Sequence, residues 1–341
     1  MSNQCIYCKN EINTDSRSRE HTFPRSFGCP DDWILRCVCK FCNNKFGRLE
    51  QWLAYDSAEG LYRLTTLGSR SSSVVSPRRL RLTIPNEERF SHLKGAVVHI
   101  DSSLPEQILL PAQVGFLNES GIREFFTEAE IESDYFKAKI DSLKKENVMI
   151  FALEQEDFKR LSGLLVCKSI LPEFNTKREE SIEMQSLLNE DSELIMDVKA
   201  TIDRDIKRVY AKIALNYVAK IEGPDFVLDN KFGEIREYIN GNTKGDYVKI
   251  SQGPVFPFET MELRTVSGHF FIFCCDNMNR LMGKVSLFYH RTGLSYDVTL
   301  CQKFSKIWCR LAKGHIFNVE HKSFSEITFV PDYRKFLNNR R

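Results

Sequence analysis

Six cysteines lie within the first 42 residues of the chain, and four of them form two C-x-x-C pairs. Each pair can present two thiolates to one tetrahedral zinc ion, so two pairs predict a closed structural zinc site. Cys37 offers a competing ligand two positions before Cys39, but the two-residue gap of the pairs is the standard spacing, which leaves Cys37 and Cys29 as bystanders. The predicted zinc ligands are Cys5, Cys8, Cys39 and Cys42.

The residues around and between these pairs could carry out hydrolysis. Glu20 and His21 follow the first pair, and Asn43 comes directly after the second. Hydrolysis of a phosphodiester with a metal ion requires oxygen ligands for a divalent cation and a base that deprotonates water. Glu20 and Asn43 carry oxygen atoms of the kind that Mg²⁺ prefers. His21, with an ordinary pKa of about 6.5, is largely neutral at neutral pH and can accept a proton.

The order of these motifs resembles the zinc-bearing HNH endonucleases of the His-Me finger, or ββα-metal, superfamily. The shared pattern is C-x-x-C, then acidic-His-x-x-Pro, then C-x-x-C-Asn. The resemblance implies that Glu20 binds a catalytic Mg²⁺ or Mn²⁺ ion, that His21 is the general base for the attacking water, and that Asn43 is the second metal ligand. It also implies that cleavage leaves a 5′-phosphate and a 3′-hydroxyl.

Three positions depart from the commonest pattern of the family. A glutamate precedes the histidine in place of aspartate, and an asparagine replaces the last histidine. Residues 33–36 contain no asparagine, although the asparagine that supplies the N of the name HNH belongs there. In the family that asparagine orients the histidine loop, and Asp31 or Asp32 could substitute for it. A subgroup of the family tolerates these changes, and its pattern has one glycine four residues after the proline and another four residues after the asparagine. Gly28 and Gly47 match this pattern.

Other charged residues near these motifs are weaker candidates. Arg25, Lys45 and Arg48 could contact phosphate groups, although exposed cations near any site are usually only solvated. Glu50 lies seven residues beyond Asn43 and therefore on the same helical face, where it could assist the metal. Its more common role would be that of a surface acid.

The element pattern and the resemblance predict an α+β fold, in which an N-terminal zinc-stabilised ββα-metal (HNH) module precedes a larger mixed α+β region. We expect the nuclease module over residues 1–60 and a linker over 61–75, where a serine-rich segment is prone to turns. The region 76–341 would serve recognition or regulation and could contain two subdomains, near 76–200 and 201–341.

Hydrophobic periodicity predicts the elements of this larger region. Residues 205–221 form the clearest helix, with one apolar face and a closing Gly223-Pro224. Its segment Lys212–Asn216 also resembles bacterial proteins that join such a module to a long C-terminal region. The other predictions are strands within 80–126 and at 148–153 and 261–275, helices near 128–146 and 156–169, and a hairpin over 285–300 with a turn at 291–293.

Several residues outside the module could suggest chemistry but do not. No phosphate-binding glycine loop or dinucleotide fingerprint occurs, so the predicted cofactors are only Zn²⁺ and Mg²⁺ or Mn²⁺. The later cysteines lie in apolar surroundings and are expected to be buried: Cys167, Cys274, Cys275, Cys301 and Cys309. The later histidines lack metal-ligand spacing and are left out of the site: His269, His290, His315 and His321.

Composition limits the partners. The formal net charge is only +2, so attraction to a polyanion must come from local patches. The first residues lack the features of a signal peptide, and no apolar run approaches the roughly 20 residues of a membrane span. We therefore expect a cytoplasmic protein without a membrane partner.

These observations predict a metal-dependent endonuclease that hydrolyses DNA, with RNA not excluded. The resemblance implies bacterial defence or mobile-element biology. Since one HNH site cuts one strand, a homodimer is one route to double-strand cutting. The missing middle asparagine leaves open an alternative, a catalytically inactive zinc-stabilised module that binds nucleic acid, and a zinc-dependent protein-interaction module is a further alternative.

Overall fold

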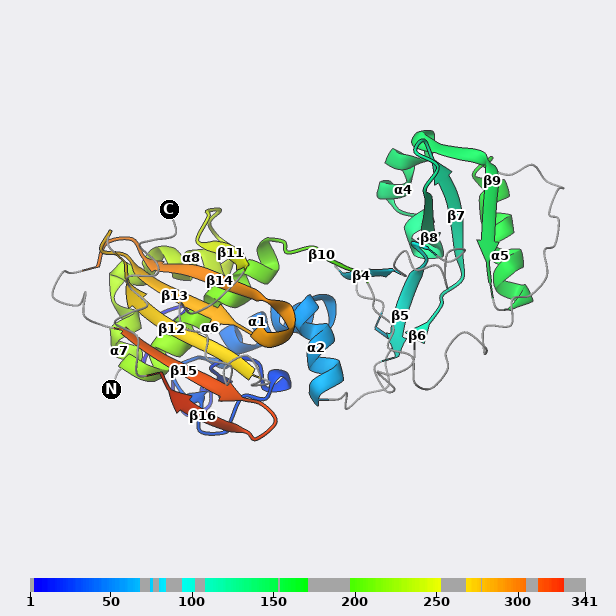
Figure 1. The fold of residues 1–341 in the computed structure, drawn as a ribbon. Coiled ribbons are helices and arrows are strands. Elements are labelled where there is room, and N and C mark those ends of the chain that lie inside the picture. The colour runs from blue at the N-terminus through cyan, green and yellow to red at the C-terminus, as the bar shows by residue number, and fades with distance from the viewer. Residues whose placement is uncertain are drawn as a thin grey trace. The chain divides into compact units, whose positions relative to one another are not determined.

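The computed structural model describes residues 3–67, 74–75, 80–83, 94–101, 108–152, 154–170, 197–252, 268–276, 278–304 and 312–327. Helices and strands are mixed throughout these ranges, so the predicted α+β class is confirmed (Figure 1). Residue contacts divide the chain into two compact units. Unit 1 combines residues 1–70 with 201–341, and unit 2 consists of residues 71–200.

The N-terminal module of unit 1 has the order ββα. Strands β1 (Glu20–His21) and β2 (Ile34–Leu35) form an antiparallel hairpin, and helix α1 (Lys40–Asp56) follows. The Sγ atom of Cys39 caps α1 by accepting a hydrogen bond from the backbone N–H of Cys42. The zinc pair at residues 39 and 42 is thereby built into the first turn of the helix.

Helix α2 (Ala58–Leu67) comes directly after α1 and extends into the range 61–75 that was expected to be a linker. Ser57 separates the two helices, because its hydroxyl donates to the carbonyl oxygen of Leu53 and accepts from the N–H of Gly60. The predicted functional division into module, linker and two subdomains stays a prediction.

Helix α6 (Arg204–Glu222) lies in the middle of unit 1. Asp203 caps its N-terminus, accepting hydrogen bonds from the N–H groups of Asp205 and Ile206, and Gly223 ends it at a φ of 91°. The predicted helix at 205–221 is therefore confirmed, but it is buried on more sides than the one apolar face that the sequence predicted. Every residue from Val209 to Ala219 is buried, because α6 contacts α1 and β2 of the N-terminal module and also the sheet of unit 1.

That sheet is antiparallel and has the order β11-β14-β13-β12-β15-β16 among the described residues. Its central strand β12 (Gly268–Cys275) is buried along its whole length. It confirms the described part of the strand predicted at 261–275, of which residues 261–267 lie outside the described residues. Two further helices, α7 (Pro224–Leu228) and α8 (Gly233–Asn240), follow α6. The strands are β11 (Val248–Gln252), β12 (Gly268–Cys275), β13 (Leu281–Ser286), β14 (Leu294–Cys301), β15 (Ala312–Asn318) and β16 (Ser323–Glu326).

The predicted hairpin near residues 285–300 is present as β13 and β14, which pair antiparallel. The connection is longer than a simple turn, because the short helix α10 (Tyr289–Thr292) occupies it. Gly293 follows this helix at a φ of 60°, a left-handed conformation that glycine adopts without strain.

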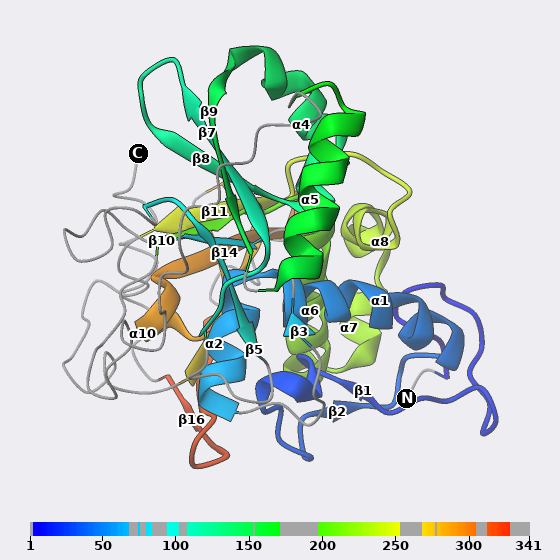
Figure 2. The same ribbon diagram turned by 90° about the vertical axis from the view of Figure 1, so that its right-hand side faces the viewer.

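Unit 2 has its own small core. Strands β7 (Gln113–Asn118), β8 (Arg123–Thr127) and β9 (Leu143–Phe151) form an antiparallel sheet in the order β8-β7-β9, and helix α5 (Gln155–Cys167) lies along β9 (Figures 1 and 2). A second sheet contains β3 (Val74–Val75), β4 (Leu80–Thr83), β5 (Val97–Asp101), β6 (Ile108–Leu109) and β10 (Asp197–Ala200).

Two expectations in unit 2 were wrong. The single helix predicted at 128–146 is divided into α3 (Glu128–Ile131) and α4 (Asp134–Lys139), because the Ser133 hydroxyl accepts from the N–H of Phe136 and starts a new helix. Strand β9 then begins at Leu143. Cys167, expected in the core, is exposed at the end of α5. Cys309 lies outside the described residues, and the remaining described cysteines of the set are buried.

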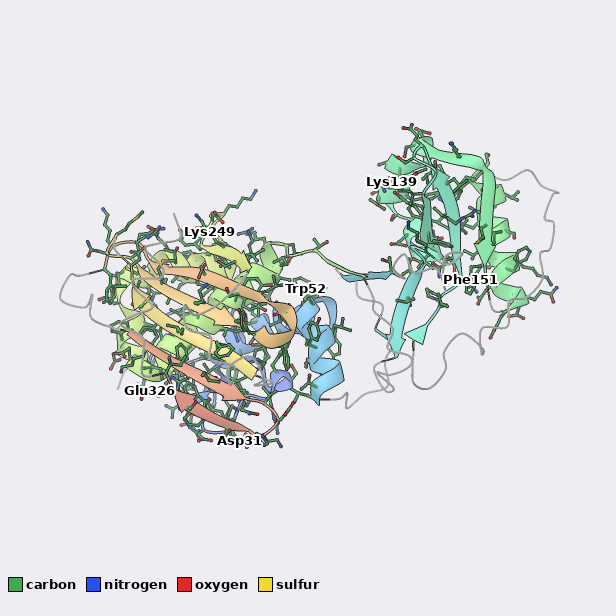
Figure 3. All side chains as sticks on the ribbon, viewed as in Figure 1. Asp31, Trp52, Lys139, Phe151, Lys249 and Glu326 are labelled. Carbon is green, nitrogen blue, oxygen red and sulfur yellow. The ribbon has the colours of Figure 1, made fainter. Side chains whose placement is uncertain are left out.

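The N-terminal module and the C-terminal part of unit 1 share one hydrophobic core. Phe23, which is fully buried, packs against Phe271 of β12 and Phe317 of β15 with ring centroids 5.0 and 5.1 Å apart. Trp33 stacks on Tyr217 of α6 at 5.9 Å and 12°. Side chains crowd the space between the sheet and the helices of this unit (Figure 3). The module is therefore completed by residues that lie far later in the chain.

We expect Phe23→Ala to destabilise unit 1 by about 3–5 kcal/mol, since it removes a buried ring from this shared core. Urea unfolding of the zinc-loaded protein measures the loss. Phe41→Ala is the matched control, because Phe41 is 75% exposed and its removal should change stability by less than about 0.5 kcal/mol. Equal effects of the two substitutions would contradict the shared core.

Candidate active site

The four predicted zinc ligands come together as expected. The Sγ atoms of Cys5, Cys8, Cys39 and Cys42 all lie within 4.8 Å of one another. Cys8 Sγ and Cys39 Sγ are 3.8 Å apart. Four sulfurs bound to one zinc at about 2.3 Å form a tetrahedron with edges of about 3.8 Å. The cluster therefore fits a structural zinc ion, and Cys29 and Cys37 do not belong to it.

Hydrogen bonding inside the cluster favours the thiolate form of Cys5. The pKa of Cys5 is lowered to about 4, mainly because the Cys42 thiol donates a hydrogen bond to it. Hydrogen bonds from backbone N–H groups lower the pKa further, whereas burial raises it. The same contact raises the pKa of Cys42. Zinc binding would remove the remaining protons, since a thiolate is the form that ligates metal.

His21 lies on β1 with a half-buried side chain, and its backbone is held on two sides. The N–H and the hydroxyl of the next residue, Thr22, both donate to the Trp33 carbonyl oxygen, at 2.9 and 2.8 Å. On the other side, Asn216 Nδ2 of α6 donates to the His21 carbonyl oxygen at 3.1 Å. Burial lowers the pKa of His21 below its usual value, and the charge of Arg25 lowers it further. The imidazole is thus neutral at neutral pH.

Glu20, the neighbour of His21 on the strand, is only 2% exposed. Successive side chains of a strand point to opposite faces, which places the carboxylate inward. Its Oε1 accepts a hydrogen bond from Lys212 Nζ and another, at 2.9 Å, from Asn216 Nδ2. Both partners belong to α6.

Lys212 is completely buried. Besides Glu20, its Nζ donates to Glu50 Oε1 at 2.6 Å and lies 5.9 Å from the centroid of the Phe46 ring. Burial alone would lower the pKa of Lys212, but the two carboxylates outweigh this effect and raise it. The ammonium is therefore charged. Glu50, a weak candidate metal ligand in the sequence, is the second partner of this lysine.

Both polar atoms of the Asn216 side chain form hydrogen bonds. Its Nδ2 donates to Glu20 and to the His21 carbonyl oxygen, while its Oδ1 accepts from the hydroxyl of Tyr7 at 2.6 Å. An asparagine that holds β1, the strand of His21 and below called the histidine strand, is thus present, although residues 33–36 contain none. Asp31 and Asp32, the substitutes considered from the sequence, are exposed.

Asn43 is half-buried in the first turn of α1. Its assignment with Glu20 to a catalytic Mg²⁺ or Mn²⁺ ion stays a prediction. The enclosed carboxylate does not fit this assignment in the present arrangement. Mg²⁺ usually keeps several of its waters, whereas Glu20 is only 2% exposed and its Oε1 already accepts from an ammonium and an amide.

The candidate phosphate-binding residues differ in their surroundings. Arg25 and Arg48 are exposed, and the Arg48 guanidinium lies 5.8 Å from the Trp52 ring centroid. Lys45 donates to the Asn240 carbonyl oxygen at 3.1 Å and lines a surface hollow of about 510 Å³ beside the second cysteine pair. Contact of any of them with nucleic acid stays a prediction.

Two of the excluded histidines, His269 and His315, have other partners, and the side chain of His290 lies outside what the structure describes. His269 is buried, accepts from the N–H of Phe288 on Nδ1 and has its Nε2 2.8 Å from the Phe27 carbonyl oxygen. His315 Nδ1 is 2.7 Å from the Tyr217 hydroxyl. His321 is exposed.

The sequence did not predict Lys212 and Asn216 as site residues. Besides the resemblance of their segment, their signal was polarity at a spacing of four within an amphipathic helix. Lys220 continues this row, and its Nζ donates to the Asp32 carbonyl oxygen at 2.5 Å. Residues four apart share a helical face, so such a polar row could have pointed to a buried network.

The N-terminal ββα module thus combines a four-cysteine cluster that fits a zinc ion with a strand that carries a histidine. Residues 5–50 match the family model described as HNH endonuclease, so this part of the chain is an HNH module. No curated protein and no solved structure matches the chain. Among the described residues, no helix combines the length and apolar character needed to cross a membrane.

Removal of one zinc ligand should release the metal and destabilise unit 1. We expect Cys42→Ser to abolish zinc retention. Zinc contributes about 10–16 kcal/mol of binding free energy in small zinc-folded peptides. If only about 4 kcal/mol of this is lost, the Tm should fall by roughly 8–16 °C.

Metal analysis of the purified protein and thermal unfolding measure these two effects. Cys29→Ser is the control, because Cys29 is a buried cysteine outside the cluster and should leave the zinc content unchanged. Equal zinc content in Cys42→Ser and the wild type would contradict the site.

Proposed function

We propose that this protein is an endonuclease that hydrolyses phosphodiester bonds of DNA through its HNH module, with His21 as the general base. The observation that carries this proposal is the placement of His21, a half-exposed and neutral imidazole on a strand held from both sides, within a stretch that matches the HNH endonuclease family.

In the proposed reaction, the neutral imidazole of His21 takes a proton from the water whose oxygen bonds to phosphorus. The bond from phosphorus to the 3′ oxygen breaks, and that oxygen takes a proton from solvent to become the 3′-hydroxyl. The backbone of the strand must stay fixed while the proton moves, because a general base acts only within hydrogen-bond reach of its proton. The Trp33 carbonyl oxygen and Asn216 supply this restraint. We assign no step to a divalent ion, since the enclosed Glu20 carboxylate does not fit one in this arrangement.

The substrate and the setting follow from the resemblance. DNA is the proposed substrate, RNA is not excluded, and the exposed Arg25 and Arg48 are the candidate phosphate contacts. Pairing of two copies for double-strand cutting, a cytoplasmic location, and a recognition or regulatory role of the remaining chain also belong to this proposal.

One observation favours a second candidate function, a zinc-stabilised module that binds nucleic acid without cleaving it. The predicted metal ligand Glu20 forms an ion pair with Lys212, so the ammonium already compensates the negative charge of this carboxylate, which would otherwise attract a catalytic cation. This candidate keeps the zinc site and the exposed cations but lacks the chemistry.

Cleavage of supercoiled plasmid separates the two functions. We expect the zinc-loaded wild type to nick the plasmid, and His21→Ala to reduce the rate by about 10²–10⁴-fold, the usual contribution of a general base. The reactions are run with Mg²⁺, with Mn²⁺ and with EDTA, and zinc content is checked afterwards.

His321→Ala is the matched control, because His321 is an exposed histidine outside the module and should leave the rate unchanged. Cleavage by His21→Ala at the wild-type rate would refute the role of His21. Plasmid binding by both proteins without any cleavage would instead favour the binding module.

A further inference from the structure

A buried group of three charges lies behind the histidine strand and takes no part in the proton transfer proposed for His21. It consists of Glu20 on β1, Glu50 on α1 and Lys212 on α6. Two carboxylates and one ammonium give a formal charge of −1. Such a pair of carboxylates would bind a divalent cation if it were open to solvent.

We propose that the Lys212 ammonium is the resident cation of Glu20 and Glu50, so that the HNH module binds a lysine of its own chain where a divalent metal ion would otherwise bind. The inference concerns the site of the proposed nuclease, but it does not depend on cleavage activity. Glu20 is then a positioning residue that fastens the histidine strand to α6.

The coordination of the ammonium supports this assignment. A lysine has three N–H donors and no acceptor. Two donors of Lys212 go to the carboxylates, and the face of the Phe46 ring lies within reach of cation–π attraction. Asn216 adds a second hydrogen bond to the same Oε1 of Glu20. The ammonium therefore has the anionic, enclosed surroundings that a buried charge requires.

The position of Lys212 on its helix makes exchange for a metal ion unfavourable. The residues around it on α6, from Val209 to Ala219, are all buried, and the Lys212 side chain itself has no exposed surface. Displacement by a metal ion would leave the ammonium buried without its partners, which is strongly destabilising. Mg²⁺ would in addition have to give up waters that it releases reluctantly.

This assignment also limits what Lys212 can do. Because it is fully buried, its ammonium cannot contact a phosphate group of a substrate. Glu50 is the one member with appreciable exposure, 24% of its side chain. Any divalent ion that supports cleavage is then bound without the Glu20 carboxylate.

Binding of Mn²⁺ to the zinc-loaded full-length protein tests the proposal, measured by the loss of the electron paramagnetic resonance signal of free Mn²⁺. We expect Glu20→Gln to leave the Mn²⁺ affinity of the wild type unchanged within about twofold. Lys212→Met should create a new Mn²⁺ site, at least about tenfold tighter than any in the wild type. The double variant Lys212→Met with Glu20→Gln should lack the new site.

Asp31→Asn is the control for a general loss of negative charge, because Asp31 is exposed on the loop before β2 (Figure 3). A wild type that binds Mn²⁺ about tenfold more tightly than Glu20→Gln would overturn the proposal, since the metal would then use Glu20 despite Lys212. A folded Lys212→Met protein without the new site would also overturn it.

If Lys212→Met does not fold, the comparison of the wild type with Glu20→Gln decides alone. Glutamine keeps an oxygen that accepts from the ammonium, so this variant preserves the packing. Failure of plasmid cleavage leaves the result intact, because ion binding is measured without substrate.

Discussion

The burial of α6 between the HNH module and the six-stranded sheet is the constraint on which the rest of unit 1 depends. A module of about 50 residues cannot bury enough apolar surface to be stable alone. Here Phe23 and Trp33 of the module bury their rings against the sheet and α6. The same helix contributes the polar contacts of Lys212, Asn216 and Lys220 to the histidine strand and its loop. Packing and polar contacts therefore fix the hairpin together.

A zinc ion in the cysteine cluster would stabilise a different part of the module from the part that α6 stabilises. The four cysteines join the N-terminal turn to the first turn of α1. They do not include the hairpin, whose position is set by Asn216 and by the hydrogen bonds to the Trp33 carbonyl oxygen. Loss of zinc and loss of the α6 contacts should thus disturb the histidine in different ways, the first through the helix and the second through the strand.

The zinc site could be predicted from the sequence because its ligands are close in the chain and have a fixed spacing. Helix α6 was predictable because its apolar period is long and its ends carry Asp203 and Gly223. Glu20 was different. Its partner Lys212 is 192 residues away, and no local pattern specifies such a contact. The exposure of Cys167 was missed for a related reason, since apolar neighbours in a sequence do not show which helical face meets the core.

The division of unit 1 into two chain segments also sets an order of events during synthesis. Cys42, the last zinc ligand, leaves the ribosome early, whereas Lys212 is translated long after Glu20. At about 5–20 residues per second, their separation of 192 residues corresponds to a delay of roughly 10–40 s. The metal site can form within the nascent chain during this interval, while the histidine strand still lacks its helix. The strand of His21 can thus be completed only after translation has passed the whole of unit 2.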